Sequence, residues 1–65
     1  MSVVNKNGVM HDFCAAVLLM DDALREEIHN AIVPCSDQEF FEAYEDAHQQ
    51  KFGEEWELSK ENPVW

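Results

Sequence analysis

The sequence predicts a mostly α-helical fold, a small three-helix domain with a short extended C-terminal segment. Apolar residues recur at helical spacing over 13–32, which predicts two helices in that stretch. A capping motif at Ser36 predicts the start of a third helix. Acidic and apolar residues alternate over 54–58, which favours an extended segment lying over the helices. At 65 residues the chain can form only one domain.

The predicted domain lies between two less ordered ends. Asn7-Gly8 is a hairpin signal, but the valine-containing runs around it are only two or three residues long. Such short flanks favour a loosely docked N-terminus. We therefore expect a flexible N-terminus over 1–11, a single helical domain over 12–58 and a tail over 59–65.

Two consecutive helices are predicted between Asp12 and Pro34. Asp12 is a good N-cap, and Asp21 and Asp22 interrupt the apolar stripe that follows it. Aspartate is unfavourable inside a helix because its side chain competes for backbone amides, so a break is expected near Asp21. Pro34 disfavours helical geometry at Val33 and should end the second helix.

The third helix is predicted to run from the Ser36 cap to about Lys51, with Gly53 closing it in left-handed geometry. Its aromatic residues fall on one side, and Glu39, Glu42 and Asp46 fall on the other. The predicted core comprises the residues where the apolar stripes and the C-terminal segment meet: Phe13, Val17, Met20, Leu24, Ile28, Phe40, Phe41, Tyr44 and Trp56.

The net charge of the chain excludes some classes of function. The chain has 14 Asp+Glu against 4 Lys+Arg, a formal net charge of -10. Direct binding to nucleic acid or to an anionic membrane is not expected, because Lys and Arg drive binding to phosphates. The longest apolar run, 13–20, is too short for a membrane span of about 20 residues. We expect a cytoplasmic protein.

Cysteine and histidine residues raise a competing hypothesis, a thiol- or metal-dependent protein that uses Cys35 with His29 or His48. Structural zinc sites usually combine two closely spaced pairs of ligands. This sequence contains at most one such pair. Cys35 precedes the helix start, a position where thiols are activated but also where an apolar residue commonly packs. The sequence thus favours no metal site and no cofactor.

The acidic helix face is the candidate site. Glu39, Glu42 and Asp46 are spaced so that their side chains lie about 5–6 Å apart, near the phosphate repeat of a nucleic-acid strand. Neighbouring acidic residues elsewhere diverge on a helix and do not form the facing carboxyl pair of a hydrolase. We therefore expect no enzyme, but a module that binds a basic protein surface. Its specific form would be a DNA-mimic inhibitor of a nucleic-acid enzyme.

Self-association is also expected. The run 13–20 is apolar on every face, including Leu18 and Leu19, which lie off the stripe. These leucines would either lie under Trp56 and Trp65 or contact a second copy in a weak homodimer.

Two stretches, AAVLLMDDALREEIH (15–29) and PCSDQEFFEAYEDAHQQKFGEEW (34–56), carry a resemblance. Together they resemble a group of short, acidic, uncharacterised proteins of anaerobic Firmicutes and their conjugative elements. The resemblance supplies no functional residue. The setting on mobile elements implies an anti-restriction or anti-defence role.

Overall fold

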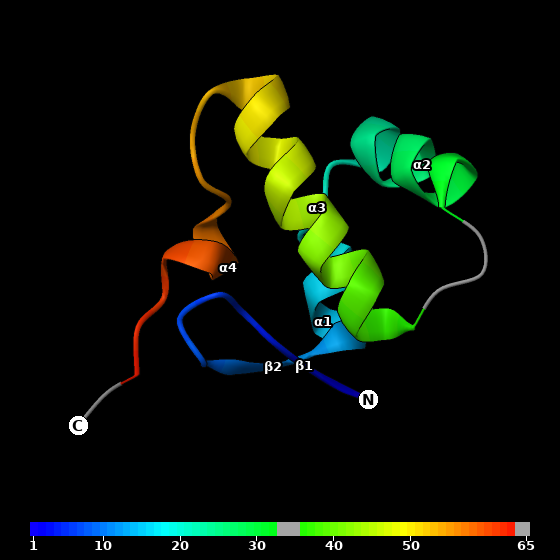
Figure 1. Cartoon of the computed structure of the whole chain (residues 1–65). Helices are drawn as coiled ribbons and strands as arrows, with labels where there is room; N and C mark the ends of the chain where they lie inside the picture. Colours follow the sequence, from blue (N-terminus) through cyan, green and yellow to red (C-terminus); the bar gives the residue numbers. More distant parts are fainter. Residues whose placement is uncertain (33–35, 64–65) are drawn as a thin grey trace.

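The computed structural model describes residues 1–32 and 36–63, and it combines helices with a small sheet (Figure 1). The prediction of a three-helix domain without a sheet was wrong. The described residues form a two-stranded sheet and four helices. In chain order these are β1 (Ser2–Val4), β2 (Met10–Asp12), α1 (Phe13–Leu18), α2 (Asp22–Ala31), α3 (Asp37–Phe52) and α4 (Glu57–Lys60).

The N-terminal segment, expected to be loosely docked, is a β-hairpin. Its strands pair antiparallel, with Val3 opposite His11. Asn5 organises the turn: its Oδ1 accepts hydrogen bonds from the backbone N–H of Asn7 (2.9 Å) and of Val9 (2.8 Å). Gly8 has a φ of 89°, a conformation that glycine adopts without steric cost. The turn signal in the sequence was therefore valid despite the short strands.

The hairpin is held against α3. Val3 is fully buried, and the ring of its cross-strand neighbour His11 stacks on Phe41 with centroids 6.2 Å apart. At the free edge of β1, the Gln38 side chain accepts from the Val4 N–H and donates to the Val4 carbonyl, both at 2.8 Å. Gln38 thus satisfies backbone groups that a third strand would otherwise pair.

The predicted break between the first two helices is confirmed. Asp12 caps α1 by accepting from Ala15 N–H, and Asp21 caps α2 by accepting from Leu24 N–H, both at 3.0 Å. The backbone N–H of Asp21 in turn donates to the Tyr44 hydroxyl at 2.8 Å. The link between α1 and α2 is therefore fixed to the centre of α3.

The prediction for α3 is confirmed at both ends. Ser36 accepts from Glu39 N–H at 3.2 Å, and Gly53 closes the helix with a φ of 74°. The expectation for Pro34 concerns a residue outside the described part of the chain.

The segment after α3 was expected to be extended, but it forms the short helix α4. Its cap Trp56 is buried, as is Leu58, so the prediction of Trp56 in the core is confirmed. Six of the nine predicted core residues are buried: Met20, Leu24, Ile28, Phe41, Tyr44 and Trp56. Three are partly buried against them: Phe13, Val17 and Phe40.

Asparagine side chains join the hairpin turn to the C-terminal segment. Asn5, only 4% exposed, donates from Nδ2 to the carbonyls of Leu58 (2.8 Å) and Glu61 (3.0 Å). Asn7 donates to the carbonyls of Ser59 (3.0 Å) and Glu61 (3.1 Å). These four hydrogen bonds, which we call the asparagine clamp, fix α4 beside the hairpin (Figure 1).

Candidate protein-interaction surface

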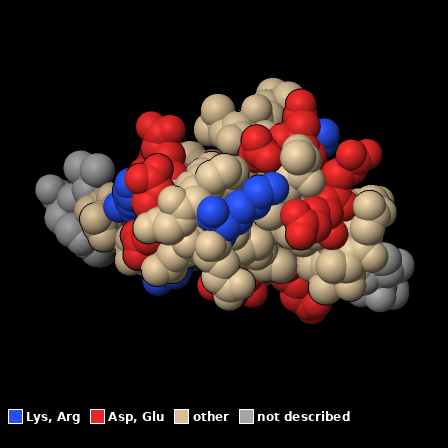
Figure 2. Space-filling model, turned by 90° about the horizontal axis from the view of Figure 1, so that it is seen from above, with Lys and Arg blue, Asp and Glu red and all other residues tan. Residues whose placement is uncertain are grey.

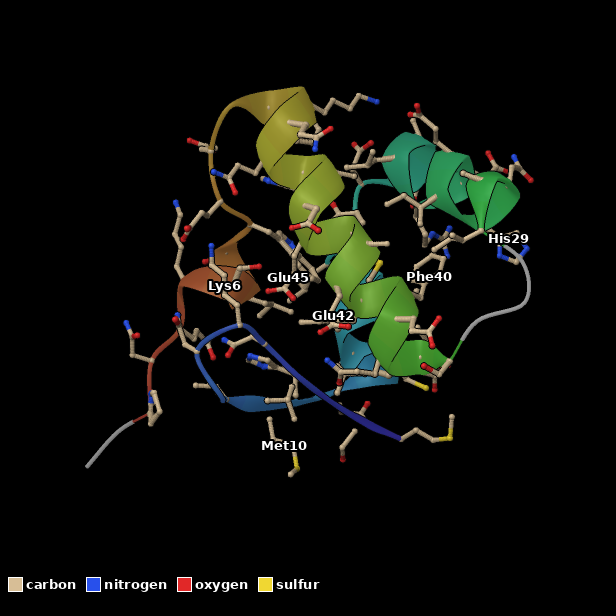
Figure 3. The ribbon with its side chains drawn as sticks, viewed as in Figure 1. Lys6, Met10, His29, Phe40, Glu42 and Glu45 are labelled. Carbon is tan, nitrogen blue, oxygen red and sulfur yellow. The ribbon has the colours of Figure 1, made fainter. Side chains whose placement is uncertain are left out.

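The acidic residues singled out in the sequence lie on the outer face of α3. Glu39, Glu42 and Asp46 are all exposed, and Figure 3 labels Glu42 on α3. They occupy successive turns of one 16-residue helix, whose opposite side carries the buried Phe41 and Tyr44. We call these three residues the acidic ladder. The buried residues of α3 fix the helix backbone from which these three side chains project.

Few cations are available to neutralise the acidic ladder. Three of the four Lys and Arg residues are engaged elsewhere: Lys6 with Glu55, Arg25 with Asp22 (3.5 Å) and Lys51 with Glu27 (3.8 Å). Among residues 1–32 and 36–63, no ion pair involves the acidic ladder. Figure 2 shows acidic side chains in several groups over one face, with basic side chains in its middle and at its edges. An excess of negative charge of this kind attracts positively charged groups.

The residues of the thiol or metal hypothesis are placed differently. His29 is exposed at the end of α2 (Figure 3), whereas His48 on α3 hydrogen-bonds through Nδ1 to the Glu54 carbonyl at 3.0 Å. Cys35 lies outside the described residues. Within the part of the chain that the structure describes, no group of three or more His, Cys, Asp and Glu side chains could hold a metal ion.

An open groove beside α3 was missed by sequence reasoning. It has a volume of about 840 Å³ and is bounded by the α1–α2 link, the second half of α3 and the segment 54–60. Leu19 and Phe52 lie at its mouth, 58% and 47% exposed. Phe52 lies one residue beyond the predicted end of the third helix at about Lys51, and spacing alone could not show that the apolar face of α3 extends past the core.

The apolar surface continues at Leu18, which is 85% exposed. Within the described residues neither Leu18 nor Leu19 is buried under Trp56. Self-association through these two leucines stays a prediction.

Glu45 is another residue whose environment was not predicted from the sequence. It lies on α3 but is only 8% exposed, and its Oε2 has no hydrogen-bond partner among the described residues. Burying a carboxylate oxygen without a hydrogen-bond partner costs free energy, so Glu45 lowers the stability of the folded state. Helical spacing gives the signal that was missed, because Glu45 follows the buried Phe41 by four residues and therefore lies beside it on α3.

Tyr44 links the groove to the core. Burial raises the pKa of its hydroxyl, the hydrogen bond from the Asp21 backbone N–H opposes this, and the Asp21 charge raises it further. The folded state therefore keeps the Tyr44 proton to higher pH than the unfolded state does.

We expect alkaline pH to destabilise the protein through Tyr44. Below the ordinary tyrosine pKa of 10.0 both states are protonated and Tyr44 contributes no pH dependence. Between 10.0 and the raised pKa of the folded state, only the unfolded state loses the proton, so stability falls by up to about 1.4 kcal/mol per pH unit in that window. Tyr44 is the chain's single tyrosine, so tyrosinate absorbance reports its titration directly. Thermal melts across this range should show a shallower decline for Tyr44→Phe, and equal slopes would contradict the assignment.

The described residues define a class of protein: a small, strongly acidic α+β domain with an exposed acidic helix face and an open groove. No helix among them combines the length and the apolar character needed to cross a membrane. A family model, Anti-CRISPR protein AcrIC5, matches residues 4–56, which is more than half of the chain. The chain belongs to this family. No curated protein matches the chain.

Membership in an anti-CRISPR family assigns the chain to the small proteins that inhibit a nucleic-acid-targeting system. This is an anti-defence role, and it fits an inhibitor that works through a protein partner rather than an enzyme. The resemblance to proteins of anaerobic Firmicutes and their conjugative elements is a separate expectation and stays one.

Proposed function

We propose that the chain inhibits a CRISPR system as a DNA mimic, by placing its acidic ladder on a basic, nucleic-acid-binding surface of a Cas component. The observation that carries the proposal is the position of the ladder. Three exposed carboxylates, without ion-pair partners among residues 1–32 and 36–63, follow one face of α3. Their separation of about 5–6 Å is near the spacing of successive phosphates.

The charge of the whole chain supports the same mechanism. A net charge of -10 attracts a basic groove from a distance and speeds encounter at low salt. Phosphate-binding surfaces are rich in Lys and Arg, so an inhibitor of opposite charge competes with the nucleic acid for them. Such an inhibitor works in the cytoplasm, where CRISPR effectors meet their targets.

Neutralising the ladder tests the proposal. The variant Glu39→Gln, Glu42→Gln, Asp46→Asn keeps the size of each side chain and removes its charge. We expect at least a roughly tenfold loss of inhibition. Contacts between opposite charges both speed the encounter of the two proteins and fix how their surfaces align. The readout is competition between the protein and labelled target DNA for a purified CRISPR effector complex.

A matched control removes the same number of charges from α2, through Asp22→Asn, Glu26→Gln and Glu27→Gln, all exposed. If both variants lose inhibition equally, net charge matters and the ladder does not. If the effector binds DNA and this protein at the same time, the mimic mechanism is wrong.

A further inference from the structure

The groove beside α3 presents apolar and acidic groups together. Its walls include the buried rings of Tyr44 and Trp56, whose centroids are 4.5 Å apart, and the exposed ring of Phe52. His48 lies between Tyr44 and Phe52 along α3. The centroid of its ring is 5.9 Å from that of Tyr44 and 4.7 Å from that of Phe52. These side chains form a continuous aromatic wall that ends in solvent.

The rim of the groove is acidic. Asp21, Glu54, Glu55 and Glu57 line it, against a single cation, Lys60. Of these acids only Glu55 is in an ion pair within the described part of the chain, with Lys6. An occupant therefore meets an apolar wall and an excess of negative charge.

One intramolecular contact already places a cation beside the wall. The Lys51 ammonium lies 5.9 Å from the centre of the Phe52 ring, within the range of a cation–π interaction. Arginine suits such a place better than lysine, because its planar guanidinium stacks on aromatic rings and pairs with carboxylates through two hydrogen bonds.

We propose that the groove binds an arginine-bearing segment of the protein partner. The guanidinium stacks against the aromatic wall at Phe52 and pairs with Glu54 or Glu57, while the stem of the arginine covers Leu19. This inference rests on the proposed function in requiring a basic partner, but it names a different surface.

The groove and the acidic ladder lie on roughly opposite sides of α3. At about 100° per residue, Tyr44, His48 and Phe52 project away from the ladder. One flat surface cannot cover both sides, so the segment in the groove is an arm or loop that projects from the partner. A second copy of this chain is a poor occupant, because its net charge of -10 would meet the acidic rim.

Titration of the isotope-labelled protein with oligoarginine and oligolysine peptides of equal length tests the inference by NMR. We expect oligoarginine to shift the Leu19 and Phe52 amides and the Trp56 indole, with an affinity about five- to tenfold above that of oligolysine. Leu19→Ser and Phe52→Ser should each remove this preference without changing the net charge. Leu18→Ser is the matched control, because Leu18 is more exposed and does not line the groove.

The other outcomes separate the two proposals. Shifts confined to the acidic ladder would overturn the groove as an arginine site and leave the DNA-mimic proposal standing. Absence of shifts from either peptide at low salt would overturn the groove as an arginine site, and the DNA-mimic proposal would still be decided by its own competition test. Groove signals that change with protein concentration alone would assign the groove to a second copy and overturn the inference.

Discussion

Alanine in place of Phe41 is expected to leave much of the chain unfolded at room temperature. The side chain is fully buried, and its ring contacts His11 from the hairpin and Trp56 from the α4 cap, with the Trp56 centroid 5.3 Å away. Removing such a ring costs about 3–5 kcal/mol. Domains of this size bury a smaller fraction of their surface than large ones, so the loss approaches their whole stability of about 5 kcal/mol. Circular dichroism and thermal melting measure the effect.

Phe52→Ala is the matched control, because it makes the same change on the same helix at a side chain that is 47% exposed. Its melting temperature should fall far less than that of Phe41→Ala. Equal melting temperatures for wild type and Phe41→Ala would show that the hairpin and α4 do not depend on α3 for their position.

Asn5→Ala is expected to destabilise the protein by about 2–4 kcal/mol. The substitution removes the two Asn5 hydrogen bonds of the asparagine clamp together with the two that shape the hairpin turn. Because Asn5 is buried, the carbonyl of Leu58 and the turn amides would lose partners that water cannot readily replace. Denaturant unfolding gives the free energy, and hydrogen exchange should show faster opening of the hairpin.

Asn62→Ala serves as the comparison for that variant. Asn62 is exposed and its side chain donates only to the nearby Lys60 carbonyl at 3.2 Å. Its loss should change the stability by less than about 0.5 kcal/mol. Similar losses for both asparagines would mean that the asparagine clamp contributes little.

The helices were predictable because their signals are local. The caps at Asp21 and Ser36 and the glycine at position 53 act within one turn of the residues that they serve, and apolar spacing gave most of the core. The exposed acidic ladder followed from the same spacing. These features depend on neighbours three or four residues away, which a sequence displays directly.

The hairpin and α4 depend on residues far away in the chain. Strands of three residues are too short to be stable alone, and β1 gains its stability from Gln38, 34 residues beyond Val4. The helical turn after Trp56 has no side-chain cap, so its sequence carried no start signal. The groove is likewise a product of packing, since its walls come from three separated segments.

The asparagine clamp also sets when the protein can become active during synthesis. Asn5 leaves the ribosome well before its acceptors, which follow 53 and 56 residues later. At about 5–20 residues per second, the nascent hairpin waits roughly 3–11 seconds for Leu58 and Glu61. A translation product interrupted before Leu58 lacks the acceptors that fix the hairpin. The fold is therefore completed only when nearly all of the described chain has emerged.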